Sequence, residues 1–298
     1  MSRRSINDLL KPKKLYCPSK ADRTGAKGRF ETKASARAED AKRAMSLRRC
    51  AEKFPEIINA EAAIKLADKL SASAGEKPPA TLASATFYRA RRNAVGGQLW
   101  QLVETCGIAP IVTATIIPEG WDIPGLDLDQ VDPVRFMERF RKALNRCGAV
   151  GSSGFIFAFM HGEYEASADV WQLHVHLVAG GEMVDVLKRL KKLKGYRTKR
   201  AAGYGTASPV YRRIRISDKP LTNLPDPLTY PMQSFWPARA RYETDKGSKR
   251  QIVKRRIVEP FHTLQLLWID RFSFKDLSLL MGLRVTSSGL KLTRQSGT

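Results

Sequence analysis

The sequence is poor in cysteine, in histidine and in long apolar runs. It has 4 cysteines in 298 residues, and they lie far apart with no Cys-x-x-Cys pair. This spacing predicts neither a zinc ribbon nor a disulfide framework. No apolar run approaches the length that spans a bilayer, and the N-terminal segment is charged rather than apolar. We therefore expect a cytoplasmic protein without a membrane partner.

Acidic residues are also scarce. The chain has 52 Lys and Arg against 29 Asp and Glu, which gives a net charge of +23. Such an excess predicts a polyanionic partner, with nucleic acid first and an anionic membrane surface second. The length suits one domain of about 150–200 residues with additions, or two small domains.

Composition divides the chain into five parts. These are a flexible basic arm (1–33), a helical region with a linker (34–80), a central domain (81–237), a charged connector expected to form an exposed hairpin or loop (238–258), and a small helical C-terminal region (259–298). The arm has too few large apolar groups to offset its ordering entropy. In the last part, a helix ending at Gly282 would fit a helix-turn-helix that reads duplex DNA, or a helical cap on the core.

A short stretch near the middle of the chain holds two of the 4 histidines. Residues 171–178 are rich in large apolar and β-branched types and precede Gly180-Gly181, which predicts a β-strand. Residues two apart in a strand share a face, so His174 and His176 place two imidazoles side by side. Two imidazoles are half of a metal site. The alternative is a pair of hydrogen-bonded or solvent-facing side chains.

The preceding strand candidate, residues 154–160, leads into His161, Glu163 and Glu165. These three side chains alternate onto one face if the strand continues. A hairpin with the histidine strand would then place a carboxylate against two imidazoles, a ligand mix that suits Mg²⁺ or Mn²⁺. The alternative for the glutamates is an exposed hairpin end.

Further elements surround this hairpin. The predicted elements are two or three helices between 34 and 74 broken near Pro55, an arginine cluster followed by a turn at Gly96-Gly97 and a helix, a strand over 111–117, a helix over 133–147, a basic helix over 182–194, a strand over 209–216 and a helix over 260–269. Thr113 and Thr115 share one face of their strand. Tyr230 precedes Pro231 and falls in a turn or helix start.

The order of these motifs resembles the HUH endonucleases, and within them the bacterial rolling-circle replication initiators. Residues 111–115 resemble the first motif of that family, and Trp171 to Val178 resemble the second. The stretch from Glu165 to Ser167 is similar to the segment that supplies the third metal ligand in many members, and Tyr230 stands where the nucleophile belongs. The resemblance covers about residues 82–237.

The resemblance implies an α+β fold with a central antiparallel sheet and flanking helices. It implies a divalent cation, Mg²⁺ or Mn²⁺, held by His174, His176 and Glu165, with Glu163 as the second choice. Tyr230 would attack a phosphodiester of single-stranded origin DNA, leaving a 5′-phosphotyrosine and a free 3′-hydroxyl. A host helicase and polymerase are candidate partners in the bacterial cytoplasm. A transposase of the same superfamily and a catalytically inactive DNA-binding protein are the alternatives.

The chain departs from the family pattern after the tyrosine. Gln233 and Ser234 stand where relatives carry a lysine or a second tyrosine, so one nucleophile is implied and the phosphate-binding charge must come from elsewhere. This departure motivates the inactive alternative. Residues 87–98 lack the cysteines that relatives carry there, so no zinc finger is expected. The other tyrosines weighed as nucleophile are Tyr196, Tyr204, Tyr211 and Tyr242.

Contacts to DNA are expected from basic and hydroxyl side chains in several elements. The predicted DNA-binding residues are Arg89, Arg91, Arg92, Thr113, Thr115, Lys188, Lys192, Arg212, Arg213 and Arg215, and the candidate stacking residues are Trp171, Trp236 and Tyr211. The alternative for each is a solvated charge or a core aromatic. His262 lies in an apolar helix and is expected to be structural.

Overall fold

The structure, a computed structural model, describes a mixed α and β protein. The described residues are 4–10, 32–72, 79–200, 210–217, 221, 224–234, 236–239, 241–244, 247–250 and 255–293. Most of the predicted basic arm lies outside them, as does Tyr204, and so do the side chains of Tyr211 and Tyr242. Among the helices of the described residues, none has the length and apolar character needed to cross a membrane.

The N-terminal region is helical, as predicted. After the short η1 (Ile6–Asp8), α2 (Lys33–Lys53) and α3 (Ala60–Ser71) lie on either side of Pro55. The next helix, α4 (Ala85–Thr105), corrects a prediction, because it runs unbroken through Gly96-Gly97 where a turn was expected. Each glycine in a helix interior costs about 1 kcal/mol. Burial of the helix around the two glycines outweighs that cost.

The central sheet is built from two interleaved β-α-β units. Its main strands lie in the order β11-β8-β3-β4-β1-β7, with β12 also paired to β3 and β2 paired to β4. β4 runs antiparallel to both of its neighbours, β3 and β1. One helix therefore connects β1 to the parallel strand β3, and another connects β4 to the parallel strand β7. The elements are β1 (Ile111–Ile116), α5 (Pro133–Arg146), β3 (Phe155–Glu165), β4 (Val170–Gly180), α6 (Met183–Leu190) and β7 (Ile214–Ser217).

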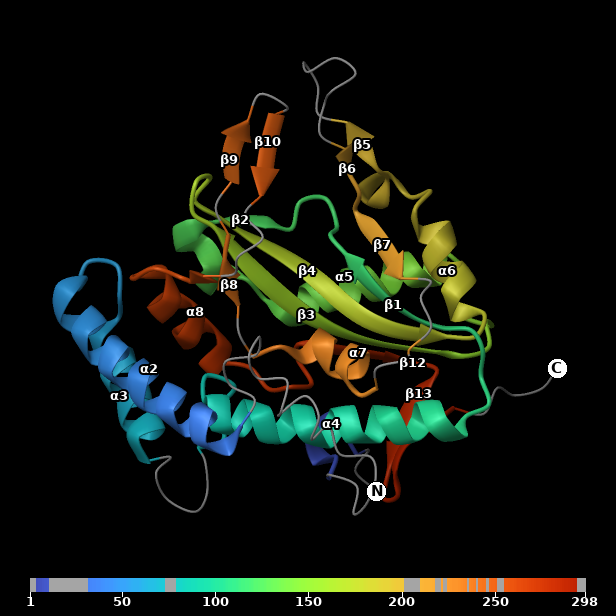
Figure 1. Cartoon of the computed structure of the whole chain (residues 1–298), viewed down its shortest axis with the longest axis horizontal. Helices are drawn as coiled ribbons and strands as arrows, with labels where there is room; N and C mark the ends of the chain where they lie inside the picture. The colour runs from blue at the N-terminus through green and yellow to red at the C-terminus, as the bar shows by residue number, and fades with distance from the viewer. Residues whose placement is uncertain are drawn as a thin grey trace.

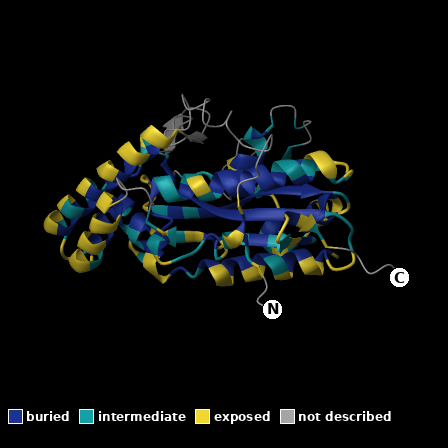
Figure 2. Ribbon diagram, turned by 90° about the horizontal axis from the view of Figure 1, so that it is seen from below, coloured by how far each residue is buried: buried dark blue, intermediate teal, exposed yellow. Residues whose placement is uncertain are grey.

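The strands β1, β3 and β4 were predicted from sequence, and the β3–β4 hairpin forms as expected. Pro133 occupies the first turn of α5, where its missing N–H costs nothing. β3 is buried at every position. Figure 2 shows the buried strands between helices whose exposed residues face outward.

Helices cover both faces of the sheet. Tyr88 of α4 packs edge-on against Phe159, which lies opposite His176 in the β3–β4 register. The α4 side is therefore the face that carries the histidines of β4. In Figure 1, α5 is drawn behind β3 and β4, and α7 (Asp226–Thr229) in front. Except for Ala36 and Ala85, which form a separate pair, nearly all of the buried apolar residues of the N-terminal helices and of the sheet belong to one contiguous core.

The C-terminal region corrects another prediction. α8 (Phe261–Asp270) forms as expected. The second helix, which either a helix-turn-helix or a helical cap would need, is instead a strand, β12 (Ser278–Met281), followed by the hairpin of β13 (Leu283–Thr286) and β14 (Gly289–Leu292). β12 completes the edge of β3 by backbone pairing. Gly282 has a φ of +65° and links two strands rather than ending a helix. A Cβ there would lie 2.0 Å from the carbonyl oxygen of Gly154.

The remaining elements are short. They are β2 (Asp122–Pro124), η3 (Gly125–Gln130), η4 (Lys194–Tyr196), β5 (Lys199–Arg200), β6 (Val210–Tyr211), η6 (Tyr230–Met232), β8 (Pro237–Ala238), β9 (Arg241–Thr244), β10 (Gly247–Arg250) and β11 (Arg255–Arg256). β9 and β10 pair as an antiparallel hairpin within the predicted charged connector. The turn at η6 places Tyr230 against the sheet, since η6 contacts both β3 and β4.

Candidate metal centre

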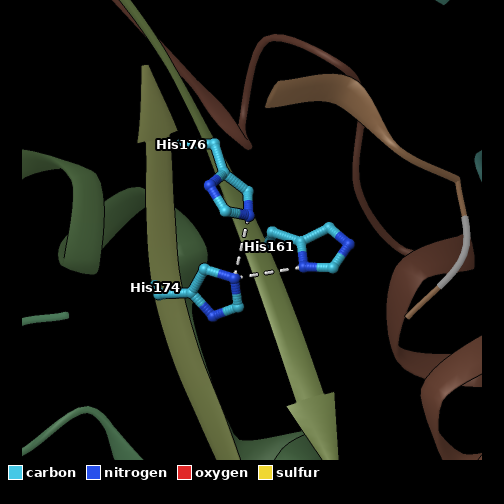
Figure 3. A group of neighbouring side chains, drawn as sticks. All are labelled: His161, His174 and His176. Atoms are coloured by element: carbon cyan, nitrogen blue, oxygen red, sulfur yellow. Dashed lines mark hydrogen bonds between the residues drawn. The ribbon is translucent and has the colours of Figure 1, made fainter. Parts of the chain in front are cut away.

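Three histidines converge on the α4 side of the β3–β4 hairpin (Figure 3). His161 lies directly opposite His174 in the register, and His176 follows two residues later on the same face. Each offers a ring nitrogen that lies within 4.8 Å of the other two. All three residues are at least nine-tenths buried. Sequence spacing therefore predicted two members of the cluster, and the hairpin register adds the third.

The backbone fixes the tautomer of His174. Its Nδ1 lies 3.0 Å from the carbonyl oxygen of Gln172, which can only accept a hydrogen bond. Nδ1 is therefore the protonated nitrogen, and the Nε2 of the neutral ring carries a lone pair. That Nε2 faces Nδ1 of His161 at 3.3 Å and Nε2 of His176 at 3.1 Å. The lone pair points into the cluster, as a metal ligand requires.

Thr115 orients the second imidazole. Its Oγ1 lies 3.0 Å from Nδ1 of His176, and the two residues are paired across β1 and β4. When Nδ1 donates its proton to the hydroxyl, Nε2 of His176 is left with the lone pair. Thr115 was predicted to contact DNA, which stays a prediction; the structure shows it bonded to an imidazole.

The nitrogen separations fit a shared ion. Two nitrogens each about 2.1 Å from one ion lie about 3.0–3.4 Å apart at ligand angles near 90–109°. The observed contacts of 3.1 and 3.3 Å fall in that range. The buried triad can thus hold a metal ion through three imidazoles.

The structure does not bring Glu165 into this cluster, which corrects its selection as the third ligand. Glu165 lies four residues beyond His161 on β3, about 13 Å along the strand. It is fully buried and accepts a 2.7 Å hydrogen bond from Ser167. Glu163, the second choice, lies nearer and pairs with Arg239 at 3.0 Å. The alternation that placed Glu163 and Glu165 on one face also includes His161, so the signal for the third imidazole was in the sequence.

Tyr230 lies beside the triad. Its ring packs edge-on against the His176 ring at a centroid distance of 4.7 Å, and 43% of the residue is exposed. Desolvation and then the negative charge of Glu163 raise the pKa of Tyr230, while Arg239 and Arg215 lower it. All three charges therefore act on the phenol.

A small pocket opens between the tyrosine and the sheet. Its volume is about 190 Å³, and it is lined by residues that include Thr115, His176, Arg215 and Tyr230. Arg215 is exposed and pairs with Thr115 across β1 and β7. The pocket thus combines hydroxyl, imidazole and guanidinium groups, which suits an anionic group the size of a phosphate.

The other predicted DNA-binding residues are scattered. In α4, Arg92 is buried, which does not favour a phosphate contact. Arg91 is half-buried and donates to the backbone oxygen of Asn7. Thr113 lines the small pocket. The remaining predicted residues are exposed or half-buried and stay predictions: Arg89, Lys188, Lys192, Arg212 and Arg213. Lys188 pairs with Asp185 at 3.0 Å.

Two of the candidate stacking residues and the fourth histidine are buried, and the side chain of Tyr211 lies outside the described residues. Trp171 and Trp236 are buried. Tyr196 is also buried, which raises its pKa to about 12. His262 is buried with its Nδ1 3.2 Å from Oε1 of Glu259, in agreement with the structural role predicted for it.

Comparison of the chain with family models, with curated proteins and with solved structures gave no match.

Proposed function

We propose that the protein is a metal-dependent endonuclease of the HUH type that nicks and rejoins single-stranded DNA through Tyr230. The observation that carries the proposal is the position of Tyr230 against His176, beside the buried triad. The interleaved β-α-β topology and the net charge of +23 support it. A replication initiator for a plasmid or phage is the role that the motif order favours, with a transposase as the near variant.

The chemistry needs a phosphate placed in the small pocket between Tyr230 and Arg215. The phenol oxygen of Tyr230 forms a bond to phosphorus, and the bond from phosphorus to the 3′ oxygen breaks. The phenol proton passes to the nearby carboxylate of Glu163, and the leaving 3′ oxygen takes a proton from water. Products are a 5′-phosphotyrosyl protein and a free 3′-hydroxyl. Attack by that hydroxyl on the phosphotyrosine rejoins the strand.

A bound divalent ion would draw charge from a nonbridging phosphate oxygen. His161, His174 and His176 would hold it, and Thr115 would keep His176 in the ligating tautomer. Three imidazoles favour Mn²⁺ or another transition metal over Mg²⁺, which prefers oxygen ligands. Of the two ions expected from sequence, Mg²⁺ and Mn²⁺, this ligand set therefore favours Mn²⁺.

The lysine that relatives carry after the tyrosine is replaced here by Gln233. Arg215 and Arg239 supply positive charge beside the phenol instead, since both lower the pKa of Tyr230. A guanidinium can bind two phosphate oxygens at once, which a lysine cannot. We assign the phosphate contact to Arg215, because it lines the pocket.

Covalent trapping tests the proposal. Wild-type protein incubated with single-stranded oligonucleotides and Mn²⁺ should form an adduct that survives denaturation. Tyr230→Phe should abolish the adduct and leave Mn²⁺ affinity unchanged, whereas Tyr242→Phe, at another tyrosine weighed as nucleophile, should leave both unchanged. An undiminished adduct in Tyr230→Phe would overturn the assignment of the nucleophile.

The second candidate is a DNA-binding protein without turnover, for which Gln233 is the motivating observation. It predicts Mn²⁺ and DNA binding with no adduct under any condition. Because both candidates bind DNA through phosphates, salt dependence does not separate them. The adduct with the wild-type chain does.

A further inference from the structure

A second and larger cavity lies where β1 ends. Its volume is about 590 Å³, and it is bounded by α5, by the loop after β1 and by η4. Arg139, Lys142 and Arg146 of α5 line it. Their spacing of three and four residues places them on one face of the helix. All three are exposed, so their charges are available to a ligand.

The wall behind these cations is aromatic. Trp121 and Tyr196 line the cavity and are buried. Arg139 lies over the ring of Phe136 at 4.3 Å, and that ring packs against Trp121 at 4.9 Å. This stacking holds the guanidinium at the mouth of the cavity. The rings form a buried wall, so the exposed cations in front of them are the groups that a nucleic-acid phosphate can reach.

Polar groups complete the lining. Asn145 can donate and accept hydrogen bonds there. Glu119 is the single carboxylate among the lining residues, so the three α5 cations outnumber it. The cavity therefore favours an anionic ligand that also offers hydrogen-bonding atoms.

The cavity and the tyrosine pocket are neighbours along β1. Thr115 lines the tyrosine pocket and Pro118 lines the cavity, and three residues of extended chain span about 10 Å. Arg213 lies between them, donating from Nη1 to the carbonyl oxygen of Ile117 while its own backbone oxygen accepts from the Ile117 N–H at 2.7 Å. Arg215, Arg213 and the α5 cations therefore mark the tyrosine pocket, the end of β1 and the cavity. Because α5 and α7 lie on opposite sides of the sheet, a strand that reaches both sites passes around the end of β1.

We propose that this cavity binds a nucleotide of the same DNA strand whose scissile phosphate lies at Tyr230, with Arg139, Lys142 and Arg146 contacting the backbone phosphate. The proposal rests on the proposed function, because it takes the strand from that site. The ligand chemistry is a nucleotide phosphate, which a free mononucleotide shares with the strand. The experiment distinguishes the two sources.

Two matched double variants of α5 test the proposal. Arg139→Gln with Arg146→Gln removes two cavity charges and keeps most of each aliphatic stem. Arg135→Gln with Arg141→Gln removes two charges from the same helix outside the cavity, where the arginines form surface ion pairs with Asp132 and Glu138. Fluorescence anisotropy would measure affinity for a nested set of oligonucleotides, shortened from each end, as a function of salt. A mononucleotide would be measured in parallel, and thermal melting would confirm folding.

For oligonucleotides long enough to reach the cavity, the cavity variant should bind at least 10-fold more weakly than the control variant. The slope of log affinity against log salt should fall by about 1.4, at about 0.7 for each lost phosphate contact. For oligonucleotides too short to reach it, the two variants should bind equally.

Equal affinities at every length would overturn the proposal. So would a loss confined to the mononucleotide, which would indicate a free nucleotide as the ligand. Because binding is measured without nicking, absence of a Tyr230 adduct would refute the proposed function and leave this readout intact.

Discussion

The four histidines of the chain lie in two environments, and both are buried. His161, His174 and His176 face one another with ring nitrogens 3.1 and 3.3 Å apart. His262 faces a carboxylate, Glu259, which also accepts hydrogen bonds from Ser46 Oγ at 2.5 Å and the Thr263 N–H at 2.9 Å. Burial alone therefore does not distinguish a ligand from a structural histidine.

The partners of each imidazole make the difference. Glu259 forms a hydrogen bond with His262 and also accepts one from Ser46, so it links α2 to the start of α8. The His262 ring therefore takes part in a structural contact. In the triad, Gln172 and Thr115 bond the outer nitrogens of His174 and His176 and direct the inner nitrogens at each other. The first arrangement stabilises the fold, and the second prepares a site for a cation.

The largest expected effect comes from substituting one histidine of each environment and measuring Mn²⁺ affinity. His174→Ala should weaken Mn²⁺ binding at least 100-fold, because it removes the central ligand. His262→Gln should leave Mn²⁺ affinity within 2-fold of wild type and lower the free energy of unfolding by about 1–3 kcal/mol, since Glu259 loses a buried partner. Isothermal titration calorimetry and urea denaturation measure the two quantities. Equal metal affinity in both variants would contradict the comparison.

The structural environment should show its own pH dependence. Burial by itself would raise the pKa of Glu259, but hydrogen bonds and charge from His262, with those from Ser46 and Thr263, lower it to about 2. A depressed folded pKa stabilises the fold above the unfolded pKa, about 4.5, and the contribution is lost as pH falls towards 2.

Glu259→Gln should therefore lower the free energy of unfolding at pH 7 by about 2 kcal/mol. The gap from wild type should shrink between pH 4.5 and 2, as followed by urea denaturation. Glu138→Gln, at an exposed ion pair with Arg141, serves as the control and should change stability by less than about 0.5 kcal/mol. A gap that does not change with pH would show that Glu259 acts through packing rather than charge.

A smaller effect is expected from the residue that orients His176. Thr115→Val removes the hydroxyl at 3.0 Å from Nδ1 and should weaken Mn²⁺ binding about 10-fold. Thr113→Val, on the same face of β1, should leave Mn²⁺ affinity unchanged. Calorimetry on the two variants distinguishes loss of the orienting bond from a general change in the strand.

The smallest effect on Mn²⁺ affinity is expected at Glu165, which the sequence suggested as the third metal ligand. Glu165→Gln should leave Mn²⁺ affinity within 2-fold of wild type, because Glu165 follows His161 by four residues of β3, a backbone rise of about 13 Å. A loss comparable to that of His174→Ala would restore Glu165 as a ligand.

Much of the core could be predicted because its signals are local. β1, β3 and β4 are marked by β-branched and aromatic residues, and α5 by its amphipathic spacing and by Pro133. The hairpin followed from the order of the two strands. Tyr230 as nucleophile stays a prediction, because proximity to His176 does not measure reactivity.

The errors arose where distant parts of the chain decide the outcome. The segment around Leu279 has apolar residues that fit a helix as well as a strand, and pairing with β3, more than 100 residues away, selects the strand. Glu165 was selected as the third ligand from a motif resemblance, whereas the strand register gives that place to His161. Both lie on one face of β3, and only the register with β4 shows which one faces His174.

Anomalous diffraction from crystals soaked in Mn²⁺ directly tests whether the three histidines bind a metal ion. We expect one strong peak bounded by His161 Nδ1, His174 Nε2 and His176 Nε2, about 2.1–2.2 Å from each nitrogen. The peak should be absent in His161→Ala. A peak beside Glu165, or no peak at the three imidazoles of the wild-type protein, would contradict the assignment of the metal site to the three histidines.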